Sequence, residues 1–355
     1  MRPVDEAELA LMVRQAAGPL RIMGGGSRGV SGPGEALEVG GLSGLVLYEP
    51  GALTLVARAG TPVTKVAGVL AAERQRLAFE PPDYRRLLGT SGEPTLGGMV
   101  AANASGPRRV QAGACRDALI GVRFVDGRGV VVKNGGRVMK NVTGLDLARL
   151  MAGAWGTLGV LSEVAFKLLP EPEAGATLVL RLGMAEAVAA MAAAMGSPFD
   201  VTGAAFVGGE ILLRLEGFSG SVSYRARALA AVLAGFGPVE VEEGVARWPG
   251  VRDVAVFAGK PGDVWRISVK PSDAPAIVER IGAEAVMLDW AGGLIWALVE
   301  PGADVRRRIG AFGGHATRVR GGLSFQPEPA GLAAIAAGLR AQFDPRGIFN
   351  PGVMV

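Results

Sequence analysis

The sequence predicts an α+β protein made of a large N-terminal part and a separate sheet domain that follows it. Three observations support this prediction. The chain has 355 residues, which is enough for two or three domains. Its first half contains two glycine-rich segments, the first of them directly after a short predicted strand, and its second half contains the order strand, helix, strand, strand, helix, strand twice.

The composition excludes several classes of protein. The chain is 49% hydrophobic and 20% charged, as expected for a folded globular protein. The net charge is only +4 and no dense block of Lys and Arg occurs, so we expect no nucleic-acid partner. With Cys115 as the single cysteine and His315 as the single histidine, we expect no disulfide framework and no zinc or iron–sulfur centre in this chain.

The targeting signals favour a cytoplasmic protein. Asp5, Glu6 and Glu8 stand where a signal peptide would carry basic residues. The apolar runs are all shorter than the roughly 20 residues that a membrane-spanning helix needs.

The N-terminal elements are predicted from capping residues and apolar spacing. Asp5 and Glu8 form a capping box for a first helix, which ends before Gly18 and Pro19. The elements expected next are strands at 20–23, 45–48 and 53–60, a helix at 61–76, a proline-rich loop at 80–83, and a hairpin at 117–133 that turns at Asp126 and Gly127.

The rest of the chain is predicted to change from this first domain to a sheet domain near residue 170. We expect a loop at 138–144, a short helix at 145–151 and a strand at 160–169, followed by a boundary at "PEPEAG". The repeated six-element order then covers 176–242 and 264–319. Side by side, two such β-α-β-β-α-β units would form one antiparallel sheet with helices on one face.

The first glycine-rich segment, "RIMGGGSRGVSGPGE" at 21–35, matches G-x-G-x-x-G at Gly24, Gly26 and Gly29. A Rossmann loop would lead directly into a helix, but Ser31 to Gly34 prevent one. Two interpretations remain, a simple glycine turn or a nest of backbone N–H groups that binds an anion. The second segment, "TLGGMVAANASGPRR" at 95–109, favours the nest, because it is typical of a helix start with free N–H groups.

Taken in order, the sequence motifs resemble the FAD-linked oxidases of the vanillyl-alcohol-oxidase, or PCMH, type nearly from end to end. The motifs are "GGGSRG", "LTLVARAGTPV", "EPPD", "TLGGMVAANASGPRR", "RDALIGVRFVDGRG", "VMKNVTGLDLARLMAGAWGTLGVLSEVAFKLLP" and "FDPRGIFNPG". Three further strings resemble one branch of this family, the FAD-binding E subunits of bacterial glycolate oxidases: "VWRISVKPSDAP", "MLDWAGGLIWAL" and "GGHATR".

The resemblance implies a domain organisation. A PCMH-type two-lobed FAD-binding domain would cover 1–170, with lobes at about 1–50 and 51–170. A cap domain with the antiparallel sheet would cover 171–325. The C-terminal helix and tail at 326–355 would then return to the FAD-binding domain.

The resemblance also implies which residues bind FAD between the lobes. Because the first glycine loop has Ser27 and Arg28 where some relatives carry a histidine bound to flavin, we expect noncovalent FAD. The implied FAD-binding residues are Gly24, Gly25, Gly26, Ser27, Arg28, Gly29, Gly97, Gly98, Met99, Asn103, Ser105, Gly106, Gly159, Val160, Glu163, Asn350 and Gly352.

The candidate catalytic residues are His315, Arg318 and Arg266. Oxidation of a 2-hydroxy acid by hydride transfer to flavin needs an arginine for the carboxylate and a base for the hydroxyl proton. In a strand, His315 and Arg318 would point to opposite faces, so this pair does not form an obvious site. A structural role for His315 therefore competes with a catalytic one, and for Arg266 the two interpretations are balanced.

The function implied by the resemblance is that of an FAD-binding subunit of a glycolate, or 2-hydroxy acid, oxidase complex. Its partners would be a larger FAD-containing subunit and an iron–sulfur subunit, and any contact with the inner face of the membrane would run through them. The apolar end "IFNPGVMV" is a candidate partner surface. Two alternatives stay open: a structural or assembly subunit without chemistry, and a stand-alone flavin oxidase of another hydroxy acid or alcohol.

Overall fold

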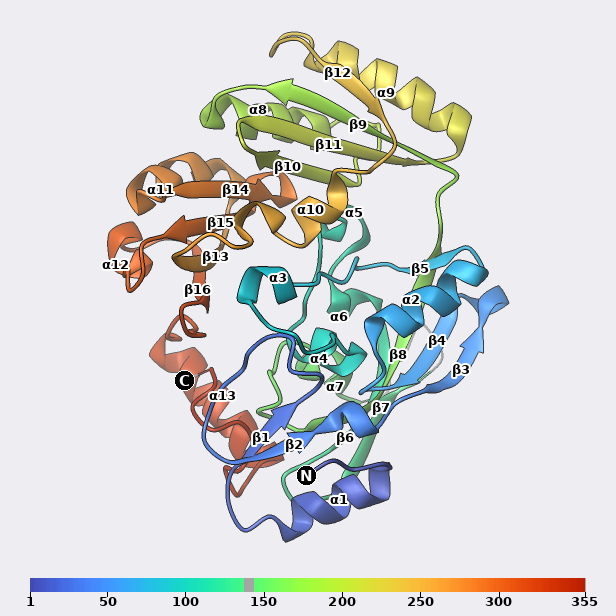
Figure 1. The fold of residues 1–355 in the computed structure, drawn as a ribbon, viewed down its shortest axis with the longest axis vertical. Coiled ribbons are helices and arrows are strands. Elements are labelled where there is room, and N and C mark those ends of the chain that lie inside the picture. Colours follow the sequence, from blue (N-terminus) through green and yellow to red (C-terminus); the bar gives the residue numbers. More distant parts are fainter. Residues whose placement is uncertain (137–143, 355) are drawn as a thin grey trace.

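The computed structural model describes residues 1–136 and 144–354. The molecule is elongated, with both termini in its lower half and a large sheet covered by helices in its upper half (Figure 1). We call residues 1–170, together with the C-terminal tail from 344, the N-terminal part. Residues 174–320 are the cap, and α13 (Ala330–Phe343) links the two along one side. The loop predicted at 138–144 lies almost entirely outside the described residues.

A small parallel sheet opens the N-terminal part. The first helix, α1 (Glu6–Gln15), is capped as predicted, because Asp5 Oδ1 accepts from the Glu8 N–H at 2.8 Å. Strand β1 (Leu20–Met23) then pairs in parallel with β2 (Glu35–Glu38). The long loop between these strands holds the first glycine-rich segment.

The C-terminal tail extends this small sheet. The Leu20 N–H donates to Ile348 O at 2.7 Å, and the Asn350 N–H donates to Leu20 O at 3.0 Å. Ile348 and Phe349 are buried in the core of the N-terminal part. The expectation that "IFNPGVMV" presents an apolar surface to a partner is therefore wrong for these two residues, because the chain itself covers them.

A second sheet forms the remainder of the N-terminal part, in the strand order β3-β4-β8-β6-β7 with β5 pairing β8. The helix predicted at 61–76 ends at Ala72, because Gln75–Leu77 pair with β8. Strand β3 precedes the lobe boundary expected near residue 50, yet it pairs with β4 in this sheet. The elements are β3 (Leu45–Glu49), β4 (Thr54–Arg58), α2 (Val63–Ala72), β5 (Gln75–Leu77), α3 (Arg85–Leu88), α4 (Leu96–Ala101), α5 (Arg109–Ala112), α6 (Cys115–Ala118), β6 (Leu119–Val125), β7 (Val131–Gly135), α7 (Leu147–Met151) and β8 (Val160–Pro170).

The cap is built on one eight-stranded sheet in the order β12-β9-β11-β10-β14-β15-β13-β16. All neighbouring strands are antiparallel, and β10 pairs β14 where the two repeated units meet. Gly208 and Gly209 form the first hairpin turn with φ of +60° and +84°, which glycine adopts without strain. The elements are β9 (Ala174–Arg181), α8 (Met184–Met195), β10 (Gly203–Val207), β11 (Glu210–Gly217), α9 (Ser219–Leu233), β12 (Glu240–Glu243), α10 (Trp248–Arg252), β13 (Asp263–Val269), α11 (Ala274–Ile281), β14 (Ala285–Asp289), β15 (Leu294–Val299), α12 (Val305–Ile309) and β16 (Gly314–Arg320).

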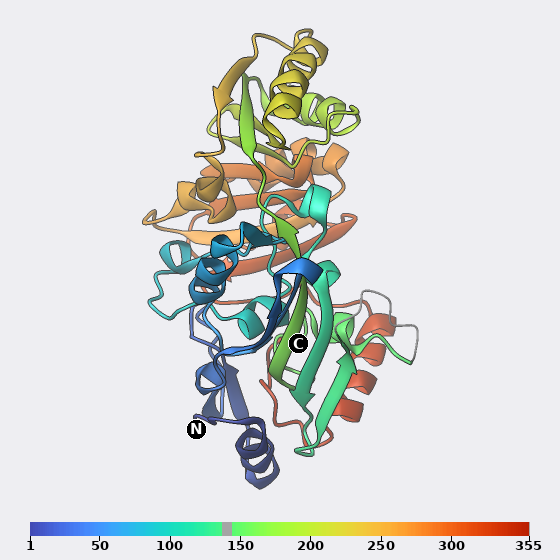
Figure 2. The same cartoon turned by 90° about the vertical axis from the view of Figure 1, so that its right-hand side faces the viewer.

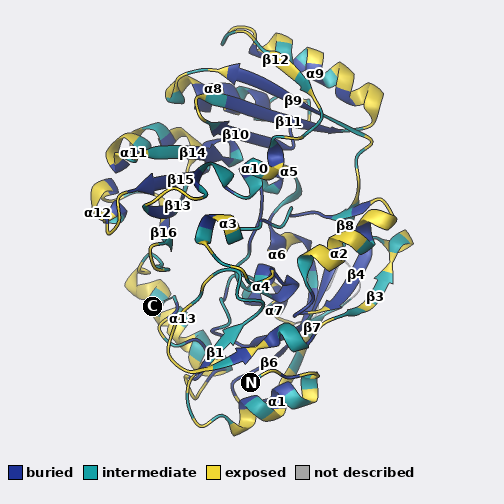
Figure 3. Ribbon diagram, in the orientation of Figure 1, coloured by how far each residue is buried: buried dark blue, intermediate teal, exposed yellow. Residues whose placement is uncertain are grey.

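Both faces of the cap sheet are buried. Helices α8, α9, α11 and α12 cover one face, and Figure 2 shows them on one side of the strands. The opposite face packs on α10 and on Leu87 of the N-terminal part. Figure 3 shows the strands of both large sheets as mostly buried, whereas α13 is mostly exposed. None of the described helices is both long and apolar enough to cross a bilayer.

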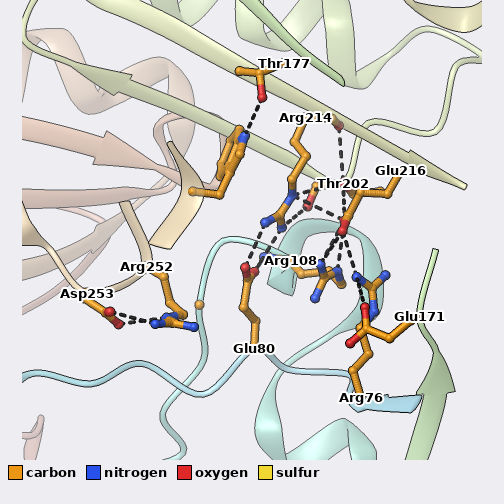
Figure 4. Close-up of polar contacts among 12 residues, drawn as sticks. Arg76, Glu80, Arg108, Glu171, Thr177, Thr202, Arg214, Glu216, Arg252 and Asp253 are labelled. Carbon is orange, nitrogen blue, oxygen red and sulfur yellow. Dashed lines mark hydrogen bonds and ion pairs between the residues drawn. The ribbon is translucent and has the colours of Figure 1, made fainter. Parts of the chain in front are cut away.

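A buried cluster of charged side chains joins the cap to the N-terminal part (Figure 4). Glu216 of β11 accepts hydrogen bonds from Arg76 and Arg108 at 2.7 Å each. Arg214, also on β11, donates to both carboxylate oxygens of Glu80 at 2.8 and 2.9 Å. Two strand residues of the cap are thus bound to three side chains of the N-terminal part.

The arginines of this cluster keep the Glu216 carboxyl group ionised. Burial alone would raise the pKa of Glu216, but Arg214, Arg108 and Arg76 together lower it from 4.5 to about 2. Because Glu216 is only 7% exposed, removing its charge would leave the buried Arg108 without an ion-pair partner among the described residues and would weaken the charge balance around Arg214 and Arg76.

We therefore expect Glu216→Gln to lower the free energy of unfolding by roughly 3–5 kcal/mol at pH 7. The pKa of about 2 in the folded protein lies below the ordinary value of 4.5. The stabilisation is therefore complete above pH 4.5 and is lost as the pH falls toward 2. Urea unfolding at several pH values should show the gap between wild type and variant shrinking over that range.

The matched control is Glu300→Gln, which removes the carboxylate from an exposed ion pair with Arg308. This variant should unfold close to wild type throughout. A Glu216→Gln defect of the same size at pH 7 and near pH 2 would show that Glu216 is not ionised in the folded protein.

Candidate functional site

A first cavity lies between the glycine-rich loop after β1 and the start of α4. The space it spans, including its open mouth, is about 990 Å³. Of the residues expected to bind FAD, it brings together Gly24, Gly25, Gly26, Ser27, Arg28, Gly29, Gly97, Gly98, Met99, Gly159 and Asn350. Both glycine-rich segments therefore face one space, although they are about 70 residues apart in the sequence.

The first segment needs glycines because it packs tightly against the loop before α4. A Cβ at Gly25 would lie 1.8 Å from Glu93 O, and one at Gly24 would lie 2.4 Å from Thr95 Oγ1. Gly26 instead needs glycine for its φ of +76°. Among the described residues, no acceptor takes the backbone N–H groups of residues 25–28. These N–H groups line the cavity and are suited to an anion.

The second segment contributes differently from what the sequence suggested. Its N–H groups were expected to be free, but the Leu96 N–H donates to Thr61 O at 3.0 Å and the Gly97 N–H to Ala59 O at 2.7 Å. The Gly98 N–H donates to Oγ1 of Thr95, the N-cap of α4. That expectation is wrong, since the protein itself satisfies these donors. Gly97 and Gly98 still leave the cavity wall without side chains.

The C-terminal tail closes one side of the first cavity through Asn350. Asn350 Oδ1 accepts from the Ile22 N–H at 2.7 Å, and Asn350 Nδ2 donates to Trp155 O at 2.7 Å. Ile22, Trp155 and Gly156 also line the cavity, and sequence reasoning missed them. The available signal was the glycine in the "AWGT" string between α7 and β8, which is typical of a turn; in the structure Trp155 has a φ of +51° at this turn.

The remaining residues expected at the cofactor lie elsewhere. Asn103 and Ser105 line a second cavity, described next. Gly106 packs against the backbone of Glu80, and Val160 is fully buried in the core.

Two further residues of that set are also outside the first cavity. Glu163 lies between Arg58 and Arg123 across the second sheet and does not line the cavity, although Leu161 does, because the pairing of β6 with β8 shifts register between these two positions. Gly352 lies in a separate hollow beside the end of α13.

The second cavity, of about 1250 Å³, lies between the N-terminal part and the cap. It shares Arg28, Ala102 and Trp155 with the first cavity, so the two adjoin. Within the described part of the chain, no Asp or Glu lines it, whereas four arginines do: Arg28, Arg109, Arg116 and Arg266. Such a wall favours an anionic ligand.

Three of these arginines contact aromatic rings and are not paired with carboxylates. Arg28 lies over the ring of Tyr84 at 5.1 Å, while Arg109 and Arg266 lie over the ring of Trp290 at 4.5 and 5.0 Å. None of the three forms an ion pair within the described part of the chain. Burial lowers the pKa of each guanidinium group, which still stays charged at neutral pH.

His315 and Arg266 meet at the second cavity, whereas Arg318 does not. His315 of β16 is opposite Ser268 of β13, and Arg266 is opposite Thr317, so both side chains point to the cavity face. Burial, with Arg266 and Arg109 nearby, lowers the pKa of His315 from 6.5 and keeps the imidazole neutral at pH 7.

Arg318 points to the opposite face of the strand, as the alternation in "HATRVR" indicated. Its Nη1 lies 3.6 Å from Asp263 Oδ2, and its Nε donates to Gly322 O at 2.8 Å. The structure thus takes Arg318 out of the candidate catalytic set. Tyr84, directly after "EPPD", and the arginines Arg109 and Arg116 are cavity residues that sequence reasoning overlooked.

Comparison with known proteins agrees with this arrangement. The family model described as FAD binding domain matches residues 1–135. Glycolate oxidase subunit GlcE of Escherichia coli (strain K12) is 38% identical over 343 residues, which cover 95% of this chain and 92% of that protein. Glycolate oxidase subunit GlcD of Bacillus subtilis (strain 168) is 39% identical over 101 residues, 28% of this chain and 21% of that protein.

Solved structures extend the likeness to the whole fold. An alkyldihydroxyacetonephosphate synthase superposes with a TM-score of 0.72 over 99% of this chain and 75% of the other, at 14% identity. At that identity the likeness concerns the fold alone. Because GlcE aligns over nearly the full length and the FAD-binding model matches, FAD is the cofactor. The chain belongs to the PCMH-type family of FAD-linked oxidoreductases that includes the glycolate oxidase subunit GlcE.

Proposed function

We propose that this chain is the FAD-binding subunit of a complex that oxidises glycolate or a related small 2-hydroxy acid. The observation that carries the proposal is the arginine-lined second cavity, which adjoins the cavity of the two glycine-rich segments. Similarity to GlcE supports glycolate as the substrate.

FAD is held noncovalently in the first cavity. The free N–H groups of residues 25–28 bind its diphosphate, and the glycines of α4 let it approach the backbone closely. The loop carries Ser27 and Arg28, and no histidine to which a flavin could be attached covalently. When bound, FAD supplies the acceptor for a hydride from the substrate carbon.

The substrate lies in the second cavity. Arg266 and Arg109 bind its carboxylate, since both guanidinium groups face the cavity without a protein counter-ion. His315, neutral at pH 7, accepts the proton of the substrate hydroxyl. This combination of anion site and base favours a catalytic chain over a purely structural subunit.

The electrons pass on through partner subunits. We expect a larger FAD-containing subunit, similar to GlcD, and an iron–sulfur subunit, since a chain with one Cys and one His lacks the ligands for a cluster of its own. The complex is cytoplasmic, and only the partners contact the membrane.

One spectrum tests the function directly. The purified chain should show the oxidised flavin band near roughly 450 nm, and anaerobic glycolate should bleach it. Bleaching only after addition of the larger FAD subunit would assign substrate oxidation to that partner. A colourless chain that still assembles would overturn the proposal in favour of a structural subunit, and bleaching by other alcohols alone would indicate a different oxidase.

Gly26→Val should abolish FAD binding, because it forces a branched side chain into a φ of +76° in the loop that lines the first cavity. Flavin per protein after desalting should fall at least about tenfold.

The matched control is Gly208→Val, at a similar φ of +60° in an open cap turn far from the cavity in sequence and fold. It carries the same backbone strain and should keep its flavin. Stoichiometric flavin in Gly26→Val would mean that the diphosphate lies elsewhere.

His315→Gln should slow flavin reduction by glycolate by roughly 10²- to 10⁴-fold, the usual contribution of a general base. In the wild type, the rate should fall only when the pH drops below 6.5, since the pKa of His315 is lowered and protonation removes the base. Stopped-flow reduction between pH 5 and 8 measures both effects.

The rate of His315→Gln should no longer fall as the pH drops below 6.5. Arg318→Gln, on the opposite face of the strand, should keep both the wild-type rate and the wild-type fall in rate at low pH. An unchanged pH profile in His315→Gln would remove His315 from the mechanism.

A further inference from the structure

Trp290 occupies a costly backbone conformation at the turn between β14 and β15. Its φ is +53° and that of Ala291 is +56°, both in the left-handed region that side-chain-bearing residues rarely adopt. Asp289 Oδ1 accepts from the Trp290 N–H at 2.7 Å and supports the turn. Two such residues in succession persist only where the surroundings hold them.

The indole of Trp290 crosses from the cap to the N-terminal part. Its Nε1–H donates to Gly106 O at 3.1 Å, a bond between residues 184 positions apart. A Cβ at Gly106 would lie 2.5 Å from Glu80 O, so this acceptor is itself fixed in position. The ring is thereby oriented at the wall of the second cavity.

Two arginines from different parts of the fold lie over this one ring. Arg109 comes from α5 of the N-terminal part and Arg266 from β13 of the cap, with guanidinium carbons 4.5 and 5.0 Å from the ring centroid. Their like charges repel each other, and neither has a carboxylate partner among the described residues. The negative face of the indole offsets this repulsion.

We propose that Trp290 is a positioning residue that holds Arg109 and Arg266 together as one carboxylate-binding pair. The bond to Gly106 fixes the ring, and the ring fixes the spacing of the two cations. The anion site is then complete only while the cap is seated on the N-terminal part. This inference rests on the proposed role of the second cavity in binding a 2-hydroxy acid.

The test compares an anionic ligand with its neutral analogue, because general loosening of the fold would weaken both. Calorimetric titration of the full FAD-loaded chain, with its flavin reduced beforehand under anaerobic conditions so that neither ligand is oxidised, gives the Kd values for glycolate and for glycolamide. In Trp290→Leu, the Kd for glycolate should rise about 10- to 50-fold, and the Kd for glycolamide should stay within about twofold. Trp290→Phe keeps a ring without the Nε1–H and should recover part of the affinity.

The matched control is Trp265→Leu on the same strand as Arg266. Two arginines, Arg306 and Arg318, also lie over the ring of Trp265, but this ring faces away from the cavity. This variant should keep the wild-type preference for glycolate, and Trp265→Phe replaces it if the leucine variant does not fold.

The outcomes separate the two proposals. If the wild-type chain binds glycolate no better than glycolamide, the proposed substrate cavity is wrong. If the wild type prefers glycolate and Trp290→Leu keeps that preference, or loses both ligands equally, then the positioning role is overturned while the cavity stands. FAD content should be equal in all variants.

Discussion

The buried ion cluster of Glu216, Arg214, Arg108, Glu80 and Arg76 is the constraint on which the arrangement of this protein depends. Charged groups of this kind are costly to bury unless each finds a partner. In this protein the partners come from opposite sides of one interface, so the cluster is satisfied only when the cap sits in one position on the N-terminal part. The second cavity exists because of that position.

The arginines at this interface lie in two different environments. In the cluster, every guanidinium group has a carboxylate partner, and the result is structural. A short distance along the chain, Arg109 follows Arg108, yet it faces a cavity without acidic residues and lies over a tryptophan. An aromatic ring can hold a guanidinium group in place without cancelling its charge. The contrast separates cations that stabilise the fold from cations that remain available for a ligand.

Local signals in the sequence predicted most of the fold. Capping at Asp5, the turn at Gly208 and the repeated six-element order all act over short distances, and the structure contains each of them. The prediction of free N–H groups at the start of α4 was wrong, because the carbonyl oxygens of Thr61 and Ala59, from an earlier segment of the chain, accept hydrogen bonds from its first turn. Pattern alone cannot reveal such long-range partners.

The candidate site shows the same limit. Strand alternation correctly separated His315 from Arg318, but only the pairing of β13 with β16 brings His315 to Arg266. Tyr84 lies outside the quoted motifs, and Trp290 lies within "MLDWAGGLIWAL" with no role that the pattern reveals. The importance of both residues arises from the arginines they contact.

The tail that pairs with β1 has a consequence for how the protein acquires its cofactor. Ile22 and Asn350 are 328 positions apart, so nearly the whole chain must be synthesised before this wall of the first cavity can form. Closing such a long loop is among the slower steps of folding. The complete first cavity therefore forms only after the chain has been synthesised to residue 350.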